Sequence, residues 1–238
     1  MSGVSNDLPL GEELDYKPAK TPGRAVLRGT HVLVRPLDAA NDAAPLFSVS
    51  HPPDGDPRIW TYLPDGPYDS PDDLHQMLRW AQASEDPLYF ALCRLPDEQP
   101  LGLASYLRIE QRLGVIEIGH IWFGVPLQRT TAASEAIYLL ARHAFDDLGY
   151  RRLEWKCNAL NAASRRAAER FGFSFEGIFR QHMIVKGRNR DTAWYAITDD
   201  EWPAIRRGFE AWLGPANMDG EGRQRRALGE LIDEARAG

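Results

Sequence analysis

The stretch VIEIGHIWFGVPLQRTTAASEAIYLLARHAFDDLGYRRLEWKC, residues 115–157, decides the fold. Alternating apolar and β-branched residues at its start predict a strand, which begins one residue earlier and runs from Gly114 to Phe123. Apolar residues then recur at helical spacing until Gly149, a residue typical of helix ends. A second strand, Arg152 to Cys157, follows directly. Because a strand, a helix and a strand at this spacing form a crossover unit, the two strands are expected to be parallel.

Upstream of this unit, short apolar runs predict an antiparallel meander. The runs Tyr89 to Arg94 and Leu101 to Arg108 are joined to each other and to the strand at Gly114 by links short enough for hairpins. A strand near Gly29 to Pro36 precedes them, and Ser70-Pro71 marks the start of a helix. The chain therefore begins with helices and antiparallel strands.

Downstream, the pattern predicts a helix at Asn161 to Phe171, strands at Phe173 to Arg180 and Arg190 to Ile197, and a helix ending near Leu213. The whole is a mixed α/β fold, with an antiparallel N-terminal meander joined by a βαβ crossover to a parallel strand and with helices on both faces. Ligands bind where the direction of a sheet changes, beyond the strand ends. This rule indicates a site near Phe123 and Cys157.

The ends of the chain lack a regular period. Residues 1–23 are rich in Gly, Pro and acids and are expected to form a flexible tail. Residues 24–214 are expected to form one domain, and residues 215–238 a charged tail or short helix, placed at Arg225 to Ala235.

Composition excludes several classes of protein. The chain is 43% hydrophobic and 26% charged with a net charge of -6, and its 28 Lys and Arg are spread out, which argues against nucleic-acid binding. No apolar run is long enough for a membrane span, and the N-terminus lacks signal-peptide order, so a cytoplasmic protein is expected. The two cysteines, Cys93 and Cys157, are expected to be reduced core residues. No His/Cys cluster has the spacing of metal ligands, so no metal is expected.

Several motifs in order resemble one known family, the GNAT superfamily of N-acetyltransferases, in its RimJ/RimL-like branch. The resemblance covers roughly residues 25–213. The motifs, given by residue range, are 115–123, 128–135, 148–154, 158–164, 170–173, 176–180, 187–191 and 201–202. The resemblance implies a GNAT-like fold, acetyl-coenzyme A (acetyl-CoA) as cofactor, and an amine as acceptor. The branch suggests a protein N-terminus, while amino acids and small amines stay open.

The family has a pyrophosphate-binding turn at the start of a helix, with small residues at fixed positions. The matching residues here are Gln128, Arg129, Thr130, Thr131, Ala132 and Ala133, with Thr131 where glycine is usual. Amides and the helix dipole favour an anion there in any protein. The Thr131 side chain can crowd this turn or donate to phosphate; alternatively, Thr130 or Thr131 merely caps the helix. The resemblance adds the amides of Phe123, Gly124 and Val125 for the pantetheine arm, and Asn158, Asn161 and Ser164 for the coenzyme.

Glu117 is the favoured general base, because an amine is mostly protonated at neutral pH and a carboxylate can take its proton. His120 is the rival base. On a regular strand the two side chains face opposite sides, so only one would reach the substrate unless a bulge intervenes. A Glu on a sheet face without a catalytic role is the alternative.

The resemblance implies that Ser164 protonates the departing thiolate, while the residue type alone also fits an ordinary helix start near the N-cap Asn161. Residues expected to bind the acceptor are Trp60, Tyr62, Phe90, His120, Trp122 and Arg180. Each aromatic residue fits the core equally well, and Arg180 equally fits a surface charge. Neither cysteine has a nucleophilic setting, so direct transfer is expected.

The sequence thus predicts an acetyl-CoA-dependent N-acetyltransferase that acts on a primary amine by direct attack. Two other hypotheses stay open: a non-catalytic acyl-CoA sensor, suggested by Thr131, and an interaction module that has lost its cofactor. A homodimer through an exposed sheet edge or the terminal helix is a further expectation.

Overall fold

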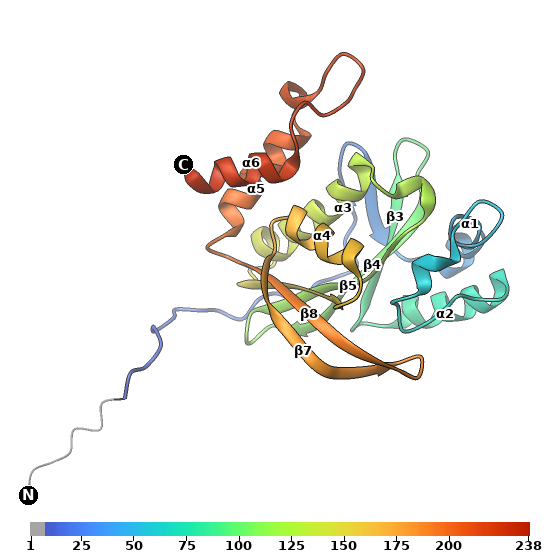
Figure 1. Cartoon of the computed structure of the whole chain (residues 1–238), viewed down its shortest axis with the longest axis horizontal. Coiled ribbons are helices and arrows are strands. Elements are labelled where there is room, and N and C mark those ends of the chain that lie inside the picture. The colour runs from blue at the N-terminus through green and yellow to red at the C-terminus, as the bar shows by residue number, and fades with distance from the viewer. Residues whose placement is uncertain (1–7) are drawn as a thin grey trace, which may run out of the picture.

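The computed structural model describes residues 8–238 and contains one mixed, eight-stranded sheet (Figure 1). The strand order is β1-β2-β3-β4-β5-β6-β8-β7, and β5 with β6 is the one parallel pair among these strands. The predicted α/β class, the antiparallel meander and the crossover to a parallel strand are confirmed. Helices α5 and α6 lie at one end of the molecule, and α1 and α2 lie at the other (Figure 1).

The strands are β1 (Leu27–Arg28), β2 (Val32–Pro36), β3 (Leu88–Arg94), β4 (Gln99–Glu110), β5 (Val115–Phe123), β6 (Arg152–Asn158), β7 (Ser174–Val185) and β8 (Arg188–Thr198). The α-helices are α1 (Ala39–Ser50), α2 (Pro71–Ala83), α3 (Thr131–Arg142), α4 (Ala162–Arg170), α5 (Trp202–Leu213) and α6 (Leu228–Ala237). A π-helical segment, His143–Asp147, extends α3, and 3-10 turns lie at Pro57–Trp60, Val125–Leu127 and Pro215–Asn217.

The parallel pair is very short. Register partners run from Val115 with Arg152 to Glu117 with Glu154, and β5 and β6 are unpaired beyond that point. The divergence therefore begins six residues before the end of β5. Between the separating strands lies a gap that side chains and ligands can enter.

Two bulges shape the strands beside this gap. On β5, His120 and Ile121 together face only Ala104 of β4, and His120 has a left-handed φ of 47°. On β4, Arg108 and its neighbour face a single residue of β5, and Arg108 has a φ of 52°. Because a bulge shifts the alternation by one residue, Glu117 and His120 need not face opposite sides.

A buried carboxylate fixes α3 against the N-terminal strands. Glu135 accepts hydrogen bonds from the amides of Thr30, His31 and Val32 at 2.8, 2.6 and 3.1 Å. A Cβ at Gly29 would collide with the Glu135 carboxyl group, which these three amides hold in place, so the turn favours glycine. The contact sets the position of the helix whose first turn borders the gap.

The C-terminal segment packs on the domain. Helix α6 crosses α5 so closely that a Cβ at Gly208 would lie 2.7 Å from the Ile232 Cα. The loop before α6 reaches α3, where Gln224 Nε2 donates to Thr131 Oγ1 at 2.8 Å. The short helix expected at Arg225 to Ala235 is present as α6.

Near the other end, Ala19 and Lys20 donate backbone hydrogen bonds to the body of the protein, so part of the expected tail is packed. Residues 1–7 of that tail lie outside the described residues, and the division at residues 23 and 214 stays a prediction. Within residues 8–238, no helix combines the length and apolarity needed to cross a membrane.

Candidate functional site

A cavity of about 940 Å³ occupies the gap between β5 and β6 and continues to the first turns of α3 and α4. This volume lies at the upper end of the range of small-molecule and cofactor sites. Twelve of the residues predicted from sequence line it: Tyr62, Glu117, His120, Trp122, Phe123, Gln128, Arg129, Thr130, Ala133, Asn158, Asn161 and Ser164. One continuous space therefore joins the predicted coenzyme turn to both candidate bases.

The first turn of α3 presents free backbone amides. Thr130 is the N-cap, and its hydroxyl accepts from the Ala133 amide at 3.2 Å. Within residues 8–238, the amides from Arg129 to Ala132 donate to no acceptor. Such amides and the helix dipole favour an anion.

The Thr131 side chain does not line the cavity, because its hydroxyl accepts from Gln224. It therefore neither crowds the turn nor offers its hydroxyl to a ligand there. The structure thus gives no reason to expect that Thr131, in place of the usual glycine, weakens coenzyme binding.

Three arginines surround this end of the cavity: Arg129, Arg166 and Arg170. None of them has a carboxylate within 4 Å in the part of the chain that the structure describes. Arg170 donates to Ser134 Oγ at 2.9 Å, and burial lowers the pKa of its guanidinium. The left-handed φ of 59° at Arg129 is a strained conformation of the kind found at binding sites. Three unpaired cations beside free amides fit a ligand with several phosphate groups.

The end of β5 offers one amide to the gap. The Gly124 amide donates to Leu101 O at 2.7 Å, so Phe123 is a non-hydrogen-bonded partner of Gly102 on β4. Its own amide therefore points to the opposite side, toward the diverged β6. The predictions for Gly124 and Val125 are corrected: the Gly124 amide is used within the sheet, and Val125 is exposed in a 3-10 turn outside the cavity.

The start of α4 forms the opposite wall. Asn161 is the N-cap, and its Oδ1 accepts from the Ser164 amide at 3.1 Å. The Ser164 hydroxyl accepts from Trp155 Nε1 at 3.0 Å, so its own proton can go to a second acceptor, either the Cys157 thiol or a ligand. Asn158 Oδ1 accepts from the Leu160 amide at 2.9 Å. Asn161 thus has the structural role that its residue type suggests and also borders the cavity.

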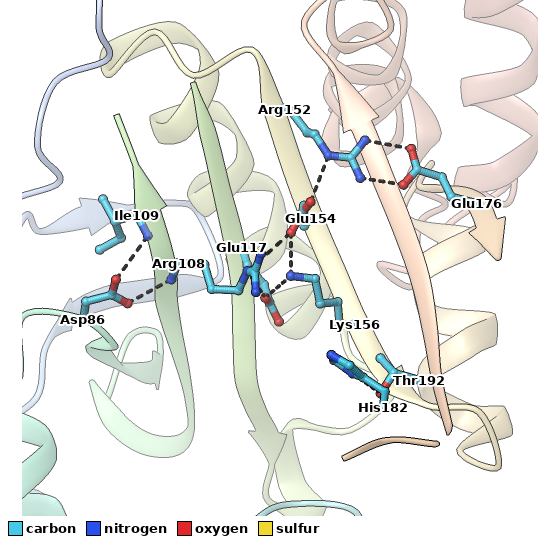
Figure 2. Close-up of polar contacts among 10 residues, drawn as sticks. All are labelled: Asp86, Arg108, Ile109, Glu117, Arg152, Glu154, Lys156, Glu176, His182 and Thr192. Carbon is cyan, nitrogen blue, oxygen red and sulfur yellow. Dashed lines mark hydrogen bonds and ion pairs between the residues drawn. The ribbon is translucent and has the colours of Figure 1, made fainter. Parts of the chain in front are cut away.

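At the other end, Glu117 belongs to a buried ion cluster (Figure 2). Lys156 Nζ lies 2.8 Å from Glu117 Oε2 and 2.6 Å from Glu154 Oε2, and it also stacks 3.8 Å over the Trp194 ring. Burial raises the pKa of Glu117 above its usual value, and the Lys156 ammonium opposes this shift. The Glu117 carboxylate is thus already bound to an ammonium group.

Arg108 borders the same cluster, with its Nε 3.9 Å from both Glu117 and Glu154. Asp86 holds the bulge that directs Arg108, because its carboxylate accepts from the amides of Arg108 and Ile109 at 2.9 and 3.2 Å (Figure 2). The bulge therefore adds a cation to the cavity wall.

His120 lies in the cavity with a defined orientation. Its Nδ1 lies 3.2 Å from both Tyr89 Oη and Ser105 Oγ. Ser105 Oγ donates to Gly119 O and can accept from Nδ1–H; we assign this tautomer to His120, which places the lone pair on Nε2. Burial lowers the pKa of His120, which keeps the ring neutral at pH 7. The β5 bulge thus brings both candidate bases to the cavity.

Three residues that the sequence predicted to bind the acceptor amine do not line the cavity, and these predictions are corrected. Phe90 is fully buried against Tyr106, and Trp60 packs on Trp122 behind the cavity wall. Arg180 is exposed on β7 and does not line the cavity. Of the predicted turn, Thr131 and Ala132 contribute amides but their side chains do not line the space.

Several residues of the cavity escaped the sequence analysis: Arg108, Trp155, Lys156, Arg166 and Arg170. Lys156 and Trp155 lie on the strand that the crossover predicts, and their side chains follow from its alternation, which was a usable signal. Arg108 had none, because a bulge directs it. In residues 8–238, no group of three His, Cys, Asp or Glu side chains is arranged to hold a metal ion.

Comparisons with known proteins agree with this geometry. Residues 31–174 match the model of the acetyltransferase (GNAT) domain. A crystal structure of a GCN5-related N-acetyltransferase from Brucella melitensis is 43% identical, covers 92% of this chain and 99% of its own, and superposes with a TM-score of 0.88. A GNAT-family structure from Chromobacterium violaceum is 40% identical, covers 85% and 100%, and has a TM-score of 0.75.

A curated relative is YdaF of Bacillus subtilis, which is named provisionally as a ribosomal N-acetyltransferase. It is 29% identical over 108 residues, which span 45% of this chain and 58% of YdaF. The match thus covers less than two thirds of that relative, and its name agrees with the branch that the motifs resemble. The family match spans more than half of the chain, which therefore belongs to the GNAT family of acetyl-CoA-dependent N-acetyltransferases.

Proposed function

We propose that this protein transfers the acetyl group of acetyl-CoA to a primary amine by direct attack of the amine on the thioester. The observation that carries the proposal is the single cavity that joins the free amides of α3 to His120 and Glu117. Bound acetyl-CoA would supply the activated acetyl group. A cytoplasmic location and a homodimer stay predictions from the sequence.

The residues at the start of α3 would hold the coenzyme. The amides from Arg129 to Ala132 and the cations Arg129, Arg166 and Arg170 match the charge of its phosphates. The free Phe123 amide is the donor available to the thioester carbonyl, where it would stabilise negative charge.

His120 is the residue best placed to take the proton of the amine. Its neutral ring and free Nε2 lone pair meet both needs of a general base near pH 7. Glu117, favoured on sequence grounds, is paired with Lys156, so accepting a proton would weaken a buried ion pair. We assign Glu117 to the ion cluster with Lys156 and Glu154. This cluster lies at the end of the cavity where the amine would bind, which we call the acceptor end.

Ser164 would protonate the departing thiolate. Its hydroxyl accepts from Trp155 and keeps its own proton available, and it lines the same cavity. Neither Cys93 nor Cys157 is an active nucleophile, because burial raises the pKa of both thiols, that of Cys93 to about 12. Direct transfer needs no acyl-enzyme.

The test measures acetyl transfer to a panel of amines, using the release of thiol and the mass of the product as readouts. The wild type is expected to turn over, with an acid limb in kcat/KM at a pKa below 6.5. His120→Gln should lose about 100-fold in kcat and that limb, whereas Glu117→Gln should keep the limb.

A limb that disappears in Glu117→Gln and persists in His120→Gln would reverse the assignment. Saturable binding of acetyl-CoA without turnover of any amine would instead favour the sensor hypothesis and refute the enzymatic one.

A further inference from the structure

Arg190 lies at the acceptor end of the cavity without a partner. Arg190 is on β8, two residues before Thr192 in the sequence. Thr192 pairs with the last residue of β6, so Arg190 lies past the paired segment, where it lines the cavity. Its Nε is buried, and within residues 8–238 it donates to no acceptor and has no carboxylate within 4 Å. Burial also lowers the pKa of this guanidinium. Arg190 as a whole is partly buried, but a guanidinium whose Nε is shielded from water and unpaired is costly, so this group is expected to meet an anion.

Among residues 8–238, no neighbouring carboxylate forms an ion pair with this cation. Among the described residues that line the cavity, Glu117 is the only carboxylate, and Lys156 already binds it. Asp191, next along β8, is occupied by the Gln181 amide at 2.8 Å and by Asn189 at 3.0 Å. Arg108 adds another cation. The acceptor end therefore carries more positive than negative charge, even with Glu154 counted.

We propose that Arg190 binds an anionic group, a carboxylate or a phosphate, of the acceptor, so the acceptor is a small amine that carries such a group. The proposal rests on the proposed function. A guanidinium matches both groups with two parallel hydrogen bonds. A protein N-terminus has a neutral peptide group at the position of this anion, so it would leave the Arg190 guanidinium without an anionic partner.

The test compares kcat/KM for matched acceptors with saturating acetyl-CoA. The pairs are α- and β-amino acids with their amides, and phosphoethanolamine with ethanolamine; a tripeptide amide represents a protein N-terminus. At least one anionic amine should exceed its neutral partner by about 10- to 100-fold, as expected for a charge-assisted bidentate contact. The better of the two anions identifies carboxylate or phosphate as the recognised group.

Variants of Arg190 test whether this side chain causes the preference for anionic over neutral amines. Arg190→Gln should bring the anionic-to-neutral ratio close to one, and Arg190→Lys should restore part of it. The matched control is Arg188→Gln, which removes an exposed arginine of the same strand outside the cavity and should keep the wild-type ratio.

Three results would overturn the inference alone while leaving the acetyltransferase assignment intact. They are neutral amines used as well as anionic ones, the tripeptide amide as the best acceptor, or a ratio unchanged in Arg190→Gln. No turnover of any amine would refute the proposed function and this inference with it.

Discussion

Lys156 holds together two buried carboxylates, and its removal gives a sharp test of the ion cluster. Its ammonium contacts Glu117 and Glu154 at 2.8 and 2.6 Å, and all three side chains are 6 to 7% exposed. Lys156→Met keeps an apolar chain of similar length but removes the charge. Glu154 would keep Arg152 at 2.9 Å, whereas Glu117, within residues 8–238, would keep only Arg108, which lies 3.9 Å away and is 55% exposed.

The expected cost follows from burial. Breaking a buried pair by removing one partner costs about 3–5 kcal/mol, because the remaining charge stays uncompensated. In the wild type the pKa of Glu117 is already raised above its unfolded value, first by burial, and loss of Lys156 raises it further. A group whose folded pKa is raised contributes stability at low pH that is lost as pH rises through that pKa. The free energy of unfolding that Lys156→Met loses should therefore be small near pH 5 and largest near pH 8. Each unit by which the pKa of Glu117 rises further is worth about 1.4 kcal/mol.

Urea unfolding at pH 5, 6, 7 and 8 measures this deficit as a free energy of unfolding. The control, Lys17→Met, removes an exposed lysine and should stay within about 0.5 kcal/mol of the wild type at each pH. A deficit for Lys156→Met below about 1 kcal/mol at pH 8, or one of equal size at pH 5 and pH 8, would refute the reasoning.

Three further predictions concern single contacts. Thr131→Gly should leave the calorimetric affinity for acetyl-CoA within about threefold and cost about 1 kcal/mol of stability, because the side chain bonds Gln224 and not the cavity; binding that becomes tenfold tighter would contradict this. Glu135→Ala should lower the free energy of unfolding by about 3 kcal/mol in urea, since three backbone amides lose their acceptor, and a loss under 1 kcal/mol would contradict the clamp. Ser164→Ala should lower kcat by about 100-fold with an unchanged acetyl-CoA affinity; an unchanged kcat at a rate limited by chemistry would remove Ser164 from the mechanism.

Most of the fold could be predicted because its signals are local. The alternation before Phe123, the helical spacing up to Gly149 and the next strand determined the crossover, which the structure contains. The β7–β8 hairpin is longer than predicted, because the turn at Lys186-Gly187 lets both strands continue past the residues with clear alternation. The early divergence of β5 and β6 has no local signal, since it depends on how the two strands pack.

The residues of the site could likewise be predicted where their signals are local, and not where they depend on distant contacts. The turn at the start of α3 and the cap at Asn161 are local motifs, and both border the cavity. The bulges at Arg108 and His120 place non-glycine residues at positive φ, and contacts distant in sequence, such as Asp86, support them. Aromatic residue type did not separate wall from core, so Phe90 and Trp60 were placed wrongly while Trp122 was not.

The central claim is that the cavity binds acetyl-CoA through the free amides of α3 and the arginines beside them. Calorimetric titration of ligand-free protein with acetyl-CoA tests it most directly. The account predicts saturable binding at one site per chain with a micromolar dissociation constant, weakened at least tenfold in Arg170→Glu, which reverses a charge beside the phosphates. No saturable binding to the wild type, or equal affinity in Arg170→Glu, would contradict it.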